Sequence, residues 1–477
     1  MQEPLRLEQK ETILRSAEAV LDEAIAFLRG MIRIPTVNPP GEAYPACARY
    51  IGEQLHSLGY TVEYINLTPA EIAELAPYGA GLPRTNVIGR LPGANASPVL
   101  HFNGHMDVVP IGPGWSTSPF GGEVRDRRIF GRGASDMKGG IAAQVYAIEA
   151  IRRAGLHLHG TVEQSGVVDE ESTGNRNAGM GLLVERGFIA PSHTDYVVIT
   201  EPLNADNICL GHRGAIWGEI TTFGHQAHGS TPERGVNAVE LMADFITEVR
   251  HELKPRLQQR LSSLPIVPSS ANAASLSFNT IQGGTNVNSV PDRCSVTFDR
   301  RLVMGERLEE ARSELCNLLE QRARTQPDFC YEYVERYATD PTWVSPQTPL
   351  VQAFAAAVQE VVGHEPGYVY SPGSDDQRFV VQNASIEQCI VYGPGEITQT
   401  HIIDESLASD DLLAAIKVMA LAAATLLGVE SDILGVQRCR VNLQHGEGAQ
   451  QGNDSEESPV EIAKAHDAAH GAHCDFT

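Results

Sequence analysis

The sequence predicts an α/β protein whose larger domain is a doubly wound, mostly parallel sheet with an inserted ferredoxin-like domain. Three observations support this fold class. Helical and strand patterns alternate over the first 210 residues, as in parallel sheets with crossover helices. Residues 211–336 change to a β-α-β-β-α-β order, which is the order of a ferredoxin-like unit. The α/β pattern then returns over residues 337–434, and a length of 477 residues favours more than one domain.

The elements of the first segment follow from hydrophobic periodicity and turn signals. The pattern predicts helices over residues 21–32, 46–58 and 138–154, and strands over residues 61–64, 99–109, 160–168 and 196–200. Doubly wound sheets place ligands beyond the carboxyl ends of their strands. Several polar residues of the candidate site lie at or just past such strand ends.

The inserted domain and the return segment are predicted in the same way. We expect a strand over 208–222, a helix over 236–261 with a break at Pro255, strands over 274–281 and 294–303, a helix over 306–324 and a strand over 329–336. A helix over 350–362, a strand over 390–392 and a helix over 407–427 follow. Residues 435–477 are rich in polar residues and are predicted to form a disordered tail.

Composition excludes several classes of function. The net charge of -24 argues against nucleic-acid binding, which needs a basic surface. We expect no membrane partner, because no apolar run is long enough to span a bilayer and the N-terminus does not resemble a secretory signal. Eight scattered cysteines without a Cys-x-x-Cys pair favour a reducing, cytoplasmic location.

His105 and Asp107 lie two residues apart at the end of a predicted strand, so their side chains share a face. A carboxylate beside a metal-binding histidine fixes the tautomer of the ring. We interpret His105 as a metal ligand and Asp107 as the residue that orients it. The alternative is a buried histidine whose hydrogen bonds are satisfied by an aspartate.

Carboxylates follow at three further positions. Asp136 stands in a Gly-rich turn before a helix, where it can bridge two metals or cap the helix. Glu170 and Glu171 are adjacent at a strand end, so one can bind metal while the other faces the cleft; a solvated pair is the alternative. Glu201 ends a mostly apolar strand, where an unpaired carboxylate is costly.

These motifs, together with a histidine near residue 400, resemble the zinc-dependent deacylase and exopeptidase family of acetylornithine deacetylase, succinyl-diaminopimelate desuccinylase, aminoacylase and glutamate carboxypeptidase. The resemblance implies two Zn²⁺ per subunit, with Co²⁺ and Mn²⁺ able to substitute. It assigns His105 and Glu201 to one zinc, Glu171 and His401 to the other, and Asp136 as the bridge. It makes Glu170 the general base and acid, and it implies a cis peptide at Asp136-Met137.

The same resemblance makes the inserted domain a lid and dimerisation domain. Residues 224–229 match a motif whose second histidine, here His228, reaches across a homodimer interface to stabilise the oxyanion in the partner's site. Asn288 matches an asparagine that contacts substrate.

Two arginines match positions that bind the substrate carboxylate, a group that guanidinium can hold bidentately. Arg301 matches the clamp, although neighbouring Arg300 leaves a one-residue ambiguity. Arg378 is either a second carboxylate contact or part of a structural salt bridge to Asp376.

The function that these features imply is metal-dependent hydrolysis of the amide bond of an N-acyl amino acid, as in a deacetylase or desuccinylase. Among relatives of this kind, a glutamate at position 201 favours the deacylase and carboxypeptidase branch. The alternative is a metallo-carboxypeptidase or dipeptidase that acts on peptide bonds. A non-catalytic metal-binding homologue is a third hypothesis, although such proteins usually lose a ligand or the catalytic glutamate.

Overall fold

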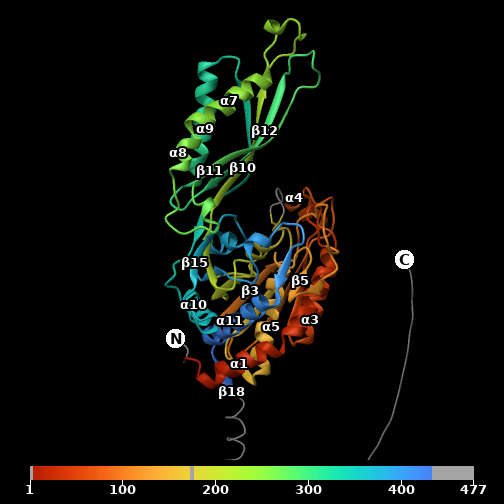
Figure 1. Ribbon diagram of the computed structural model, residues 1–477, viewed down its shortest axis with the longest axis vertical. Coiled ribbons are helices and arrows are strands. Elements are labelled where there is room, and N and C mark those ends of the chain that lie inside the picture. The colour runs from red at the N-terminus through yellow and green to blue at the C-terminus, as the bar shows by residue number, and fades with distance from the viewer. Residues whose placement is uncertain (1–3, 172–176, 432–477) are drawn as a thin grey trace, which may run out of the picture. The chain divides into compact units, whose positions relative to one another are not determined.

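The computed structural model describes residues 4–171 and 177–431, so the tail predicted over residues 435–477 lies outside the described residues. A nine-stranded mixed sheet organises most of this chain (Figure 1). Its strands in spatial order are β1 (Thr61–Asn66), β2 (Thr85–Leu91), β7 (Thr161–Val167), β3 (Val99–His105), β8 (Tyr196–Ile199), β16 (Cys389–Val391), β9 (Asn207–His212) and β14 (Thr342–Trp343), with β15 (Gly367–Ser371) also paired to β9.

The prediction of a mostly parallel sheet was wrong, because the observed sheet is mixed, with antiparallel strands on both sides of a parallel centre. Strands β7, β3, β8 and β16 form a parallel centre. On one side, β2 and β1 are added antiparallel, and on the other β9 runs antiparallel to β16 and β14. Periodicity reports that a segment is a strand but not its direction in the sheet, so the sequence could not distinguish the two arrangements.

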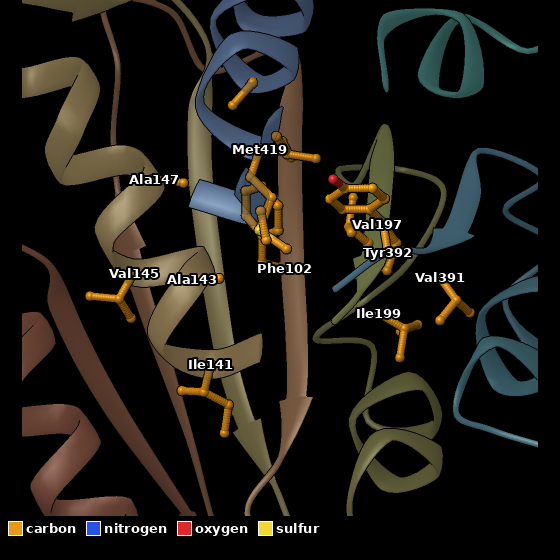
Figure 2. Close-up of a cluster of buried hydrophobic side chains, with 14 of the residues drawn as sticks. Phe102, Ile141, Ala143, Val145, Ala147, Val197, Ile199, Val391, Tyr392 and Met419 are labelled. Atoms are coloured by element: carbon orange, nitrogen blue, oxygen red, sulfur yellow. The ribbon is translucent and has the colours of Figure 1, made fainter. Parts of the chain in front are cut away.

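Among the described residues, six long helices cover this sheet, either directly or by packing on the other helices. They are α1 (Leu7–Ala19), α2 (Leu21–Ile32), α3 (Tyr44–Ser57), α5 (Lys138–Arg153), α10 (Pro349–Val362) and α11 (Ser409–Leu427). Helices α1 and α2 are the two that pack on the other helices. Helix α5 is buried from Lys138 to Ile151, as expected for a helix covered by other helices. Figure 2 shows Met419 of α11 directed toward Phe102 of β3 within this core. No helix of the described residues is both long and apolar enough to cross a bilayer.

A second sheet of four antiparallel strands has the order β11-β12-β10-β13. Its elements along the chain are β10 (Gly214–Phe223), α7 (Ala238–Glu252), α8 (Lys254–Gln258), β11 (Ser275–Gly283), β12 (Arg293–Leu302), α9 (Leu308–Thr325) and β13 (Cys330–Thr339). Helices α7 and α9 pack on one face of this sheet around a separate apolar core (Figure 1). We call these elements the four-stranded unit.

The strand predicted over 208–222 is in fact two strands in different sheets. It breaks at Arg213, between β9 of the nine-stranded sheet and β10 of the four-stranded unit. The Arg213 guanidinium donates to the carbonyls of Ala271, Ala273 and Arg301 at this junction. The helix predicted over 236–261 also breaks, at Leu253, and Pro255 lies in the first turn of α8.

Candidate metal centre

Three neighbouring parallel strands carry polar residues at the same edge of the nine-stranded sheet. His105 is the last residue of β3, Glu171 follows the end of β7, and Glu201 follows the end of β8. Because β3 pairs in parallel with both β7 and β8, their carboxyl ends meet. The fold thus brings together residues that are almost one hundred positions apart in the sequence, as the strand-end rule predicts.

Two groups of three donors form around Asp136. In one, His105 Nε2 lies 3.2 Å from Asp136 Oδ1 and 3.3 Å from Glu201 Oε1. In the other, His401 Nε2 lies 3.3 Å from Asp136 Oδ2 and 3.0 Å from Glu171 Oε1. Within each group the candidate ligand atoms all lie within 4.8 Å of one another. Each oxygen of Asp136 therefore faces a different group.

The donor set fits a pair of divalent cations. Imidazole nitrogen and carboxylate oxygen are ordinary ligands of zinc and its neighbours in the transition series. Asp136, Glu170, Glu171 and Glu201 bring four carboxylates into one site, and all are less than 15% exposed. Such crowding is unfavourable without positive charge nearby. Burial raises the pKa of Glu171 to about 7 and that of Glu201 to about 8, because desolvation disfavours the charged form of a carboxyl group.

The turn that carries Asp136 is fixed from two sides. The buried Glu405 carboxylate accepts hydrogen bonds from the backbone N–H groups of Ser135 and Asp136 at 2.9 and 3.0 Å, and it pairs with Arg132 at 2.6 Å. A Cβ on Gly140 would lie 1.9 Å from the carbonyl oxygen of Thr200, so only glycine permits α5 to approach the end of β8 this closely. The Asp136-Met137 peptide is cis, as expected.

Asp107 is fully buried and contacts both the histidine and the glutamate pair. His105 Nδ1 lies 3.0 Å from the carbonyl oxygen of Asp107, which leaves Nε2 to face the carboxylates. Asp107 Oδ2 accepts from the backbone N–H of Glu171 at 3.0 Å, and Oδ1 accepts from that of Glu170 at 3.4 Å. Asp107 thus orients His105 at the end of β3 and also Glu170 and Glu171 after β7. The sequence had suggested only the contact with His105.

A buried ion pair next to Glu170 was missed by the sequence analysis. Asp169 has a φ of 61°, a left-handed conformation that aspartate tolerates better than most residues. Its carboxylate accepts from Arg84 Nε at 3.0 Å and from the Tyr44 hydroxyl at 3.1 Å. Asn38 Nδ2 connects Asp169 to Asp107. The run Asp169-Glu170-Glu171 was visible in the sequence, but nothing marked Arg84 as buried.

Glu170 lies beside both donor groups without belonging to either. Its Oε2 is 3.9 Å from His105 Nε2 and its side chain is 12% exposed. Burial and the neighbouring Glu201 carboxylate raise the pKa of Glu170 well above its ordinary value, against the opposing effect of His105. Glu170, Glu171, Glu201 and His401 line one cavity of about 320 Å³ that also includes residues 371–375.

Comparison with known proteins places this centre in a family. The sequence model of peptidase family M20/M25/M40 matches residues 101–425. The chain belongs to this family. As a member of family M20/M25/M40, it is a metal-binding hydrolase of amide bonds.

Relatives and solved structures of the family cover most of the chain. Succinyl-diaminopimelate desuccinylase of Dechloromonas aromatica is 28% identical over 398 residues, which are 82% of this chain and 95% of the relative. The M20 family metallo-carboxypeptidase Sso-CP2 of Sulfolobus solfataricus has a TM-score of 0.69 at 20% identity, over 85% of this chain and 99% of its own. Human carnosine dipeptidase 1 has a TM-score of 0.68 at 18% identity, over 89% and 100%. At these identities the two structures establish a shared fold.

In this M20 family chain, His228 and Asn288 are neighbours in the four-stranded unit. His228 pairs through its backbone with Ser289, and the Gly229 N–H donates to the Asn288 carbonyl at 2.7 Å. His228 Nδ1 lies 2.7 Å from the Ser230 hydroxyl. Within the described residues, none of these hydrogen bonds reaches the metal centre of the same chain.

The two candidate clamp arginines of this M20 family chain have different environments. Arg300 is 2% exposed and pairs with Glu306 and Glu314 on the helix side of the four-stranded sheet. Arg301 faces the other side, is 22% exposed, and lines a cavity of about 420 Å³. A buried, doubly paired guanidinium is poorly suited to bind a ligand, so this geometry favours Arg301.

Arg378 donates to the carbonyl of Asp375 at 2.8 Å and lies over the rings of Tyr337 and Phe379. Asp376 instead accepts from Asn103 and Asn177. The alternative of a direct salt bridge between Arg378 and Asp376 is therefore not seen among the ion pairs of the described residues.

Proposed function

We propose that this chain is a di-zinc deacylase that cleaves the amide bond of an N-acyl amino acid, acting as a cytoplasmic homodimer. The observation that carries the proposal is the placement of Asp136 between two donor groups, with Glu170 beside them in the same cavity. The desuccinylase named among the relatives supports an N-acyl amino acid as the substrate class. Scattered cysteines, six of them free thiols within the described residues, support the cytoplasmic location.

In this proposal His105 and Glu201 would hold one zinc, Glu171 and His401 would hold the other, and Asp136 would contribute a ligand to both. Co²⁺ or Mn²⁺ would be accepted by the same donors. When bound, the two metals would supply the Lewis acidity that lowers the pKa of a water molecule and polarises the acyl oxygen. Asp107 keeps His105 in the tautomer that presents Nε2 to the metal side of the site.

Glu170 acts as the base and then as the acid. Its carboxylate takes a proton from the water that attacks the acyl carbon. The same carboxyl then gives that proton to the amine nitrogen as the C–N bond breaks. The raised pKa of Glu170, caused mainly by burial, suits a group that must hold a proton between these two steps.

We further propose that residues 1–210 and 337–434 form the catalytic domain and that residues 211–336 form an inserted ferredoxin-like lid and dimerisation domain. The element order and sheet order of the four-stranded unit support this division. His228 of the partner subunit would stabilise the oxyanion. Within its own chain the His228 ring contacts the Ser230 hydroxyl. Asn288, Arg301 and Arg378 would contact the substrate, with Arg301 as the carboxylate clamp.

The test is a comparison of N-acetyl and N-succinyl amino acids with dipeptides, using zinc-loaded protein. We expect turnover of N-acyl amino acids, and preferred turnover of dipeptides would instead support the peptidase alternative. Glu170→Ala should lower kcat by about 10²–10⁴-fold while two metal ions per subunit remain bound, because Glu170 moves protons without being a ligand. Glu365→Gln, a change at an exposed glutamate, is the control. Near-normal turnover of the Glu170 variant would remove this residue from the mechanism.

A further inference from the structure

An aromatic and cationic stack crosses three strands of the four-stranded sheet. Trp217 on β10 stands directly opposite Asp299 of β12 on one side and Tyr337 of β13 on the other. The Arg301 guanidinium lies 5.2 Å from the centre of the Trp217 ring. The rings of Trp217 and Tyr337 are 4.5 Å apart and inclined by 32°. Because β10 lies between β12 and β13, Arg301 and Tyr337 flank the indole from opposite sides.

The stack continues toward residues 371–375, which line the cavity that also contains Glu170, Glu171, Glu201 and His401. Arg378 lies 5.4 Å from the centre of the Tyr337 ring and 4.3 Å from that of Phe379. The Tyr337 hydroxyl lies 2.9 Å from the hydroxyl of Ser374, a residue of the wall of the metal cavity. Arg301 is thus connected through two rings to the wall of the proposed active site.

Arg301 itself is held by Asp299 and lines the cavity of about 420 Å³. Its Nε contacts both carboxylate oxygens of Asp299, at 2.8 and 3.1 Å. Within the described residues, the hydrogen bonds of this side chain run through Nε and not through the two terminal nitrogens. A carboxylate binds guanidinium through just such a pair of N–H groups.

The indole is held by its faces. Its Nε1 is buried with no hydrogen-bond partner in the described part of the chain. Stacking is therefore the interaction that fixes the ring, and a guanidinium over the face of tryptophan is the strongest form of cation–π contact. An arginine side chain that is not held in place loses its rotamer freedom when substrate binds, and this entropy loss lowers the affinity. An arginine already fixed by stacking avoids that loss.

We propose that Trp217 and Tyr337 are positioning residues that hold the Arg301 guanidinium ready for the substrate carboxylate. This inference rests on the proposed function, since it assumes a carboxylate-bearing substrate. Removing the indole should then weaken recognition of the carboxylate without changing the chemistry at the amide bond.

The experiment compares an N-acyl amino acid with its carboxamide analogue, in which the carboxylate is replaced by a neutral amide. The measured quantity is kcat/KM for the carboxylate substrate divided by kcat/KM for the carboxamide analogue. We expect Trp217→Leu to lower this ratio by about 3- to 30-fold through the KM of the carboxylate substrate. Turnover of the carboxamide should stay unchanged. Trp217→Phe, which keeps a ring, should recover part of the ratio, and Tyr337→Leu should act in the same direction as Trp217→Leu.

A double-mutant cycle separates the positioning of Arg301 from general damage to the four-stranded unit. In an Arg301→Met background, Trp217→Leu should have little further effect on the ratio. Tyr333→Leu is the matched control, because Tyr333 stacks on Phe298 at 5.6 Å in the same sheet without touching Arg301.

An unchanged ratio in Trp217→Leu and Tyr337→Leu, or fully additive effects with Arg301→Met, would overturn the inference. If the wild-type protein hydrolyses neither compound while it cleaves dipeptides, the proposed function fails instead. The two failures are therefore distinguishable.

Discussion

Arg84 is fully buried although its side chain carries a permanent charge. Its Nε binds Asp169, and its terminal nitrogens donate to the carbonyls of Leu82 and Pro40. The guanidinium therefore joins two loops to the residue that precedes Glu170. A buried pair of this kind gives little net stability, but loss of one partner is costly.

We predict that Arg84→Met lowers the free energy of unfolding by about 3–5 kcal/mol, because Asp169 is left as an unpaired buried charge. The double variant Arg84→Met, Asp169→Asn should be more stable than the sum of the single changes predicts. Urea unfolding of the metal-loaded protein measures these values. Additive losses would show that Arg84 and Asp169 do not act as a pair.

At the scale of elements, the turn before α5 depends on a residue from the segment that precedes α11. Glu405 stands just ahead of β17 (Ser406–Ala408), which leads into α11, and its carboxylate holds the backbone of Ser135 and Asp136. The bridging position of Asp136 is therefore set by a residue from a distant segment of the chain.

Replacing Glu405 by glutamine should weaken metal binding by about 10- to 100-fold, as loss of a residue that orients a ligand commonly does. The amide cannot accept from both backbone N–H groups and also pair with Arg132. Titration with Zn²⁺ in a competing chelator gives the affinity. Asp404→Asn serves as control, since Asp404 accepts from the Ser116 N–H rather than from the Asp136 turn. Equal affinity of the Glu405 variant and wild type would contradict the prediction.

The sequence predicted the elements around the centre more accurately than their arrangement. Residues 21–32 and 138–154 were predicted as helices and form α2 and α5 almost to the residue. The split of the predicted strand 208–222 was missed because β9 and β10 are both apolar and contiguous. Their sheets differ only in tertiary context, which a local pattern does not contain.

The candidate ligands could be predicted because each lies at a strand end or in a recognisable turn. His105, Asp136, Glu171, Glu201 and His401 are indeed brought together. The residues that support them were harder to find. Arg84 and Glu405 resemble ordinary surface charges in the sequence, and only the packing of distant segments buries them.

At the scale of the whole molecule, the metal centre should control stability as a function of pH. In the metal-free protein, burial raises the pKa of Glu171 to about 7 and of Glu201 to about 8. Folded carboxyl groups with raised pKa values bind more protons than the unfolded chain, so stability falls as pH rises from about 5 to 8.

We therefore expect the metal-free protein to have a lower Tm at pH 8 than at pH 6. The metal-loaded protein should lose less over the same range, because bound cations stabilise the ionised carboxylates. Thermal unfolding with and without chelator measures both differences. Parallel pH profiles for the two forms would argue against this origin of the effect.

The proposed dimer makes a second prediction at this scale. Glu170→Ala and His228→Ala should each be inactive as homodimers, whereas mixed dimers purified after co-expression should regain about half of wild-type activity. In the mixed dimer, one of the two sites combines an intact Glu170 with an intact His228 of the partner subunit. Activity of purified mixed dimers tests this, and no recovery would indicate that His228 does not act across an interface.

The chain leaves the nine-stranded sheet at His212 and comes back at Thr342, and these two residues are direct partners in the pairing of β9 with β14. The segment between these two residues, well over one hundred residues long, therefore begins and ends at a single residue pair of the sheet. Loop-closure entropy depends only weakly on loop length once the ends are fixed together. Insertions of other lengths or folds could therefore replace this segment during evolution while the nine-stranded sheet kept its shape.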